Sequence, residues 1–189
     1  MMRGYRTSAP RLAHDAPGRL RARRVLSAVG AAWVLSLGFD LLLHAGLLAK
    51  LYIKPSPFLL QPEEAFRRIP LGYLAFLGLV LSLYWLFRRL GIHGVASGLR
   101  HGCVVGWAVW GAVVVGLYSI STAAPPLLVG WWIGQGVELG LAGAVLGAAA
   151  GGVSLKRIWV VVVLACIGCL AATVVLQSFG LAPAMKKIN

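Results

Sequence analysis

The sequence predicts an all-α protein, a polytopic bundle of transmembrane helices, and two observations carry this prediction. Of the 189 residues, 59% are hydrophobic and only 12% are charged, and the mean hydropathy is +0.83. About a quarter of the residues in a soluble domain are charged, so most of this surface cannot face water. The apolar residues also gather in long runs, and a run of about 20 residues crosses the hydrocarbon core of a bilayer as a helix.

The apolar runs predict five transmembrane helices within one domain. The basic segment 1–23 contains prolines and lacks apolar periodicity, so it predicts a disordered tail. Residues 24–178 form the bundle, and residues 179–189 form a short C-terminal tail. The predicted spans cover about residues 25–48, 70–87, 102–119, 127–149 and 158–176.

Two connecting segments have recognisable patterns. Residues 50–69 predict a loop in which Pro62 opens a short helix at the membrane interface. Glu63 and Glu64 follow this proline and two arginines close the segment, an order that suits the helix dipole. Residues 150–154 contain two glycines and predict a break between the fourth and fifth spans.

The formal net charge of +13 is concentrated in the N-terminal tail and at the edges of the apolar runs. This distribution predicts contact with the bilayer itself and with anionic lipids at the basic tail. Nucleic acid is not an expected partner, because the aromatic residues lie inside apolar runs and not beside cations. With the N-terminus in the cytoplasm, twelve basic residues lie on the inner side and six on the outer side. The sequence therefore predicts a multi-pass protein of a bacterial cytoplasmic membrane with its N-terminus inside.

Glycines of the fourth span predict a helix-packing surface. At roughly 100° per residue, four of them fall within about 60° of one another. Such a stripe of small residues lets another helix approach closely, and Gly102 and Gly106 give the third span a shorter version. The stripe consists of Gly136, Gly140, Gly143 and Gly147.

Polar residues of the first and fourth spans predict a cluster inside the bundle. Only two acids, Asp40 and Glu138, lie within predicted spans. A carboxyl group in hydrocarbon costs about 3 kcal/mol, so such groups face the interior and find partners. Helical spacing places Trp33, Ser36 and His44 on the face of Asp40, and Gln135 on the face of Glu138. The candidate ligand-binding or ion-binding residues are Asp40, His44, Glu138, Gln135, Tyr73 and Trp131.

Three roles stay open for this cluster. It is a path for protons or cations, or a pocket for a small ligand, a lipid head group or a quinone. The third role is structural, an interhelical hydrogen-bond network in which each bond contributes about 1 kcal/mol.

No metal site and no catalytic residue are predicted, and the sequence leaves the nature of any cofactor undetermined. Asp40, His44 and Glu138 are three possible ligands of a divalent ion, but their spacing does not show a site. No hydroxyl nucleophile has a base within reach in the pattern. Cys166 and Cys169 have the spacing of a redox pair, yet no other cysteine and no histidine is near them in the sequence, which favours a helix contact.

Four short motifs carry a resemblance. They are Gly38-Phe39-Asp40 through His44 and Tyr52, Gly98-Leu99-Arg100-His101-Gly102, Tyr118 before a turn, and Trp131 through Glu138 to Gly143. Together they resemble a group of uncharacterised small bacterial integral membrane proteins with four closely spaced transmembrane helices. The resemblance covers about residues 28–149, so the fifth span and the basic tail would be additions. It implies no known activity and supplies no catalytic or binding residues.

The sequence thus predicts a non-enzymatic binding or accessory component of a membrane complex. Other membrane subunits or further copies of the chain are the expected protein partners. The alternative is a small transporter or channel that moves protons, cations or a small solute through Asp40, His44 and Glu138. A membrane enzyme acting on a lipid or redox substrate is the third possibility.

Overall fold

The computed structural model describes residues 16–53, 57–60 and 62–183, and the side chains of all of these except 16–21, 62 and 63. The described residues form helices joined by short turns, which confirms the all-α class. The helices are α1 (Ala16–Leu42), a π-helical turn η1 (Leu43–Leu47), α2 (Ala49–Tyr52), α3 (Pro62–Leu90), α4 (Val95–Ile120), α5 (Pro125–Ala150) and α6 (Leu155–Ser178).

Among the described residues, five helices are long and apolar enough to cross a membrane, as the sequence predicts. This chain is therefore a multi-pass helical membrane protein. The five segments are Ala22–Leu47, Glu64–Leu90, Val95–Ile120, Pro125–Ala150 and Leu155–Ser178.

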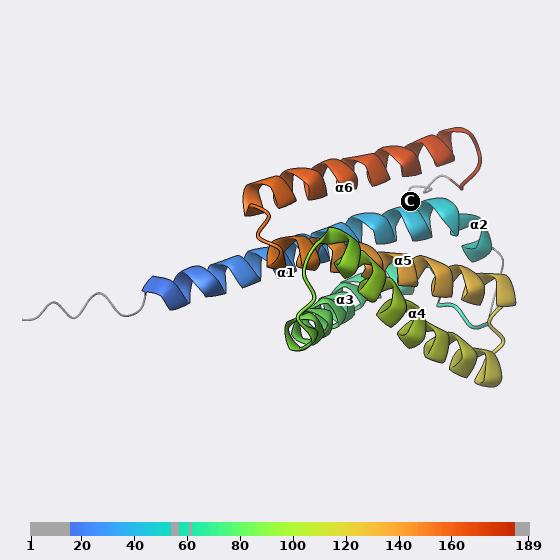
Figure 1. The fold of residues 1–189 in the computed structure, drawn as a ribbon. Coiled ribbons are helices and arrows are strands. Elements are labelled where there is room, and N and C mark those ends of the chain that lie inside the picture. Colours follow the sequence, from blue (N-terminus) through green and yellow to red (C-terminus); the bar gives the residue numbers. More distant parts are fainter. Residues whose placement is uncertain (1–15, 54–56, 61, 184–189) are drawn as a thin grey trace, which may run out of the picture.

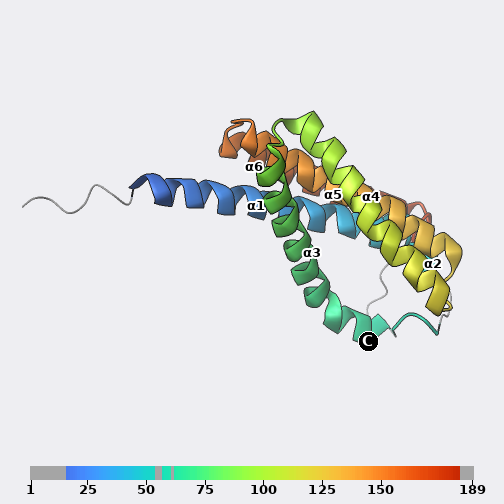
Figure 2. The ribbon, with the colours of Figure 1, turned by 60° about the horizontal axis from the view of Figure 1, so that its bottom comes forward.

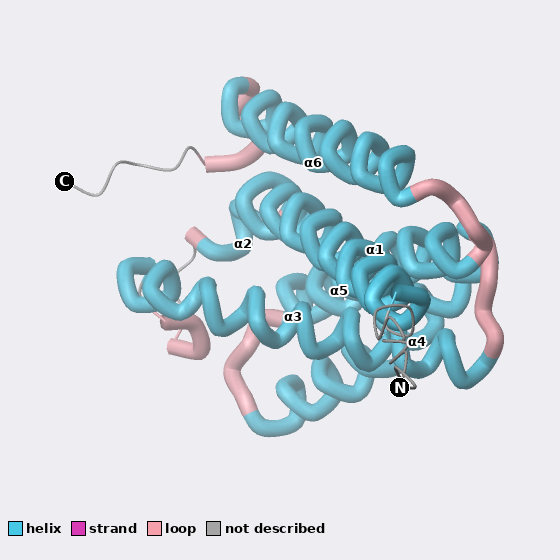
Figure 3. Tube along the Cα trace, turned by 90° about the vertical axis from the view of Figure 1, so that its left-hand side faces the viewer, coloured by secondary structure: helices cyan, strands magenta, loops and turns pink. Residues whose placement is uncertain are grey.

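Helix α5 lies at the centre of the bundle. It packs closely along α4 on one side and against α1 on the other (Figure 1). Helix α6 covers the far side of α1, on the opposite side of the bundle from α4 (Figure 3). Helix α3 packs on α1 and α5 at an angle, and its N-terminal end lies away from the other helices (Figure 2). Most of α5 is consequently buried, while one broad face of α4 and of α6 is left for lipid.

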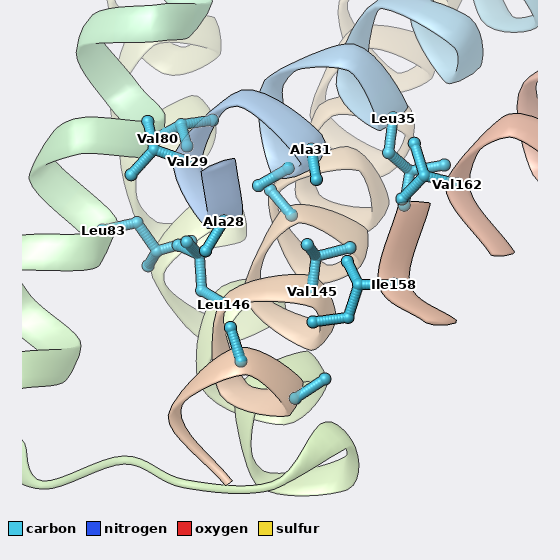
Figure 4. Packing of buried hydrophobic residues seen from close by; sticks show 14 of the residues in the cluster. Ala28, Val29, Ala31, Leu35, Val80, Leu83, Val145, Leu146, Ile158 and Val162 are labelled. Carbon is cyan, nitrogen blue, oxygen red and sulfur yellow. The ribbon is translucent and has the colours of Figure 1, made fainter. Parts of the chain in front are cut away.

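The apolar core lies where α1, α3, α5 and α6 meet (Figure 4). Helix α1 contributes small residues there, so its neighbours approach its backbone closely. Ala31 and Ala32 are fully buried, and Val80 and Leu83 of α3 lie beside Val29 and Ala28 of α1 (Figure 4). This core occupies the end of the bundle that the charge pattern predicts to be cytoplasmic.

The boundaries of three helices differ from the predicted ones. Helix α3 begins at Pro62 and continues through Pro70, so the predicted interfacial helix and the second span are one helix. A proline within a helix removes one hydrogen bond. Here the ion pair between Glu64 and Arg68 supports the turns before it. Helix α1 already begins at Ala16, inside the predicted tail, and residues 1–15 of that tail lie outside the described residues.

Helix α4 starts at Val95, about two turns before the predicted span. Gly94 makes this start possible, because its φ of +86° is a conformation that favours glycine. The predicted break after α5 is present, since Gly152 has a φ of +89° there. Ser154 then caps α6, and its hydroxyl accepts a hydrogen bond from the Arg157 backbone N–H at 3.4 Å.

Glycines on both helices form the contact between α4 and α5. A Cβ atom added at Gly98 would collide with the carbonyl oxygen of Gly143, and one added at Gly147 would collide with the carbonyl oxygen of Gly94. The Gly94 N–H also donates a hydrogen bond to the Gly147 carbonyl at 2.8 Å. The two backbones therefore touch directly, without side chains between them. Gly136 and Gly140 continue this surface against side chains of α4.

Candidate functional site

Polar side chains meet between α1 and α5, on the face of α5 opposite α4. Ser36 and Asp40 lie on α1, and His44 lies on the π-helical turn that follows it. Gln135 and Glu138 lie one turn apart on α5. We name these five residues, together with Tyr52 and Trp131, the polar cluster. The sequence predicts that the other members lie near one another, but it assigns Tyr52 no role in the site.

A chain of hydrogen bonds connects four members of the polar cluster. The Trp131 indole N–H donates to the Tyr52 hydroxyl oxygen at 2.5 Å. The same hydroxyl lies 2.5 Å from His44 Nδ1, and His44 Nε2 lies 3.1 Å from an Asp40 carboxylate oxygen. With a neutral imidazole, one order of donors satisfies all three contacts of the chain. The Tyr52 O–H donates to Nδ1, and Nε2–H donates to Asp40.

The π-helical turn places His44 in this chain. It is closed by a hydrogen bond from the Leu48 N–H to the Leu43 carbonyl at 2.8 Å. His44 keeps its i,i+4 contact with Asp40, and the π-helical turn and α2 after it bring Tyr52 back beside His44. Such turns occur frequently at functional sites. A helical wheel drawn at a constant 100° per residue does not account for the π-helical turn.

The deepest members of the polar cluster are acceptors without partners. Glu138 is 1% exposed and Gln135 is 2% exposed. Within the described residues, no hydrogen bond of ordinary geometry reaches either carboxylate oxygen of Glu138 or the side-chain oxygen of Gln135. The Ser36 hydroxyl is a weak hydrogen-bonding neighbour of the Glu138 carboxyl group, outside the geometry of an ordinary hydrogen bond, and Asp40 is an electrostatic neighbour of the same group. A buried polar atom without a partner costs about 1–3 kcal/mol, so this group of oxygens requires an explanation.

Gln135 joins the acceptors to the hydrogen-bond chain. Its amide nitrogen lies 3.4 Å from His44 Nε2, which already faces Asp40. One ring nitrogen cannot donate to Asp40 and accept from Gln135 in the same state. A hydrogen bond between Gln135 and His44 therefore forms only when Nε2 does not donate to Asp40.

Tyr73, the remaining predicted site residue, lies at the margin. The Trp33 indole N–H donates to its backbone carbonyl at 2.9 Å, which ties α1 to α3. The Tyr73 side chain is an electrostatic neighbour of Asp40, but no hydrogen bond joins it to the polar cluster in the described residues. The residues of the predicted polar face of the first span thus contact different helices. Trp33 binds α3, whereas Asp40 lies near α5.

Toward the predicted cytoplasmic side, the polar cluster ends at Ser36 and Glu138. Below them the contact between α1 and α5 is made of buried apolar side chains, among them Ala32 and Ala142, which are fully buried. On the other side, the Asp40 and His44 side chains are 17% and 31% exposed. The polar cluster is therefore partly exposed at its Asp40 and His44 end and buried at its Ser36 and Glu138 end.

No three histidine, cysteine, aspartate or glutamate side chains converge as a possible metal site among the described residues. Asp40, His44 and Glu138 are thus close without forming a metal-binding group. Two of the three cysteines make packing contacts with glycines. Cys166 lies against Gly38 of α1, where a Cβ atom would come within 2.6 Å of its sulfur, and Cys103 lies against Gly140.

No protein-family model, curated protein or solved structure matches the chain. The resemblance to bacterial membrane proteins with four helices stays a prediction.

Burial raises the pKa of Tyr52 to about 12, and the charge of Asp40 acts in the same direction, while the Trp131 indole acts against them. Tyr52 lies in α2, outside the membrane-spanning segments. Its ordinary pKa is 10.0, so folding favours the neutral hydroxyl. The resulting contribution to stability is complete below about pH 10 and is lost as the pH rises toward 12.

Replacing Tyr52 by phenylalanine is expected to lower the free energy of unfolding by about 1–2 kcal/mol at pH 7. The change removes the acceptor of Trp131 and the donor to His44 together. Thermal unfolding in one detergent between pH 7 and 12 measures the effect. The difference between wild type and Tyr52→Phe should shrink above pH 10, because only the wild type has this hydroxyl to ionise. A difference that stays constant to pH 12 would contradict the role given to Tyr52.

Proposed function

We propose that this protein is a non-enzymatic binding component of a membrane complex, and that the polar cluster binds a small cation with N–H donors. The observation that carries the proposal is the group of unpaired, buried oxygens on Gln135 and Glu138. Asp40 faces them from α1 and adds a second carboxyl group. A buried site with more acceptors than donors is stabilised by a ligand that brings positive charge and hydrogen-bond donors.

An ammonium group suits this site better than a metal ion does. It needs three or four acceptors, and each N–H satisfies one of them. A hard divalent cation takes about six or more oxygen ligands, and no set of three metal-ligating side chains is found among the described residues. The ligand class is therefore ammonium itself or a small primary amine. Entry would follow the exposed edge of His44 and Asp40.

The orientation and setting belong to the same proposal. The N-terminus lies in the cytoplasm of a bacterium, and the polar cluster opens toward the outer side, because the basic residues favour the other end of the bundle. Lipid and other membrane subunits or further copies of the chain would cover the exposed faces of α4 and α6.

Transport through the same residues is the alternative function. The partly exposed side chains of Asp40 and His44 support access to these residues from one side of the membrane. The apolar contact below Glu138 closes the other half in this conformation. A transporter would need a second arrangement of α1 and α5 that opens this contact.

Thermal unfolding of the purified full chain in one detergent tests the proposed ligand class. Ammonium chloride and ethanolamine hydrochloride should raise the Tm of the wild type above that in choline chloride of equal ionic strength, because choline has no N–H donor. A ligand at about ten times its Kd stabilises by about 1.4 kcal/mol, or about 3–6 °C for a chain of this size. Sodium chloride is included as a fourth salt, because a Tm increase in it would show binding of a monovalent metal ion without N–H donors.

Glu138→Gln and Asp40→Asn should abolish the Tm increase, since each removes a carboxyl group while keeping its shape. Glu64→Gln is the matched control, because this acid is exposed on α3 and paired with Arg68. It should retain the increase. Equal Tm values in all four salts, or a loss in Glu64→Gln as large as that in Glu138→Gln, would refute the binding site and leave a structural network.

A further inference from the structure

A second cavity lies at the opposite end of the bundle from the polar cluster. It has a volume of about 450 Å³ and lies between α1, the C-terminal end of α3, the turn after it and the end of α5. Its polar side chains come from three elements: Arg24 from α1, Tyr84 and Arg88 from α3, and His93 from the turn before α4. None of the residues that line the cavity is acidic.

Arg24 is held in place over this cavity. Its guanidinium Nη2 donates to the carbonyl oxygens of Ala149 and Val153, each at 3.2 Å. These carbonyls lie at and just beyond the C-terminal end of α5, where a cation also favours the helix dipole. A guanidinium group carries five N–H donors, so those on Nε and Nη1 stay available to an acceptor in the cavity. The α5 end thus orients Arg24 without neutralising its charge.

Two consecutive arginines of α3 have different surroundings. Arg88 lines the cavity, whereas the Arg89 guanidinium lies over the Trp85 ring, 5.5 Å from the ring centroid. Neither arginine forms an ion pair with a described acidic side chain, since the pairs found there involve Asp40 and Glu64. Arg88 and Arg24 are therefore two cations at one cavity that form no ion pair with an acidic side chain in the described part of the chain. Arg89 carries the same charge one residue further along α3 but does not line the cavity.

The rest of the cavity is apolar. Val25 and Ala28 of α1, Phe87 of α3 and Leu146 of α5 form its lining toward the membrane interior. We propose that this cavity is a binding site for the phosphate head group of an anionic phospholipid, with Arg24 and Arg88 on the phosphate and the apolar lining against the glycerol and the upper acyl chains. A basic pocket between transmembrane helices matches this ligand class. A soluble phosphate would match only the polar half of the lining.

Native mass spectrometry of the intact chain in detergent tests the site. The protein is titrated with phosphatidylglycerol and with phosphatidylcholine of the same acyl chains, and separately with inorganic phosphate. Wild type should bind phosphatidylglycerol at least tenfold more tightly than phosphatidylcholine, and inorganic phosphate should not displace it. Arg88→Ala should weaken phosphatidylglycerol binding about tenfold, because a hydrogen-bonded charge pair is lost.

Arg89→Ala is the matched control, with the same change of charge one residue away, and it should bind like wild type. Arg24→Lys keeps the charge but loses the planar group, so it should also weaken binding without removing the cation at the end of α5. Equal losses in Arg88→Ala and Arg89→Ala would show diffuse attraction and overturn the proposal. Equal affinity for both lipids would also overturn it, and so would displacement by inorganic phosphate, which would identify a soluble phosphate ligand.

Discussion

Replacing Gly98 by alanine is expected to lower the free energy of unfolding by about 2–3 kcal/mol, the largest effect of any single methyl group in this protein. The new Cβ atom would meet the carbonyl oxygen and carbon of Gly143, which are backbone atoms that cannot rotate away. Helices α4 and α5 would have to move apart along a contact made of glycines on both sides. In a bilayer such close packing is a main source of helix association, because lipid tails are as apolar as the side chains.

Gly116→Ala on the same helix is the control for this prediction. A Cβ atom there would have nothing within 4 Å, so the substitution should leave stability unchanged or raise it by up to about 1 kcal/mol through helix propensity. Reversible unfolding of both variants in one detergent measures the two free energies. Similar stabilities of Gly98→Ala and Gly116→Ala would show that α4 and α5 do not touch as described.

The second large effect is expected for Leu83→Ala, at about 2 kcal/mol. Leu83 is 2% exposed and belongs to the core formed by α1, α3 and α5. Truncation of a buried leucine leaves a cavity, and in soluble proteins the total cost is about 3–5 kcal/mol. A membrane protein loses mainly the packing part of this amount, because the unfolded helix keeps its side chains in lipid.

Helix α3 would be the element released, since it packs mainly on α1 and α5 over part of its length. Leu81→Ala is the matched control, because Leu81 is 48% exposed on the same helix and faces lipid. Proteolysis or cysteine labelling near residues 62–70 should increase in Leu83→Ala and not in Leu81→Ala. A Leu83→Ala variant as stable as Leu81→Ala would place α3 elsewhere in the bundle.

The number of spans and the residues that share one face of each helix follow from the sequence pattern. Apolar runs long enough for a bilayer define five helices, and the period of 3.6 residues fixes which side chains share a face. This is why the glycine stripe of α5 and the pair Gln135 and Glu138 could be assigned to different sides of one helix. The sequence pattern predicts the ends of the helices less accurately. The predicted starts of the second and third spans, at residues 70 and 102, lie inside helices α3 and α4, because a local cost is outweighed by continuous backbone hydrogen bonds.

Apart from the polar faces of the first and fourth spans, which the sequence predicts to lie together, the faces that meet are known from the tertiary structure. The stripe of α5 packs on α4, while its polar face packs on α1, and nothing in a single helix selects its neighbour. Tyr52 joins the polar cluster because a π-helical turn and α2 return the chain to His44, which a constant helical period does not contain. The same holds for Arg24, whose partners Ala149 and Val153 are distant in sequence. Periodicity acts within one helix, whereas binding sites form where separate helices touch, and that contact depends on the packing of the whole bundle.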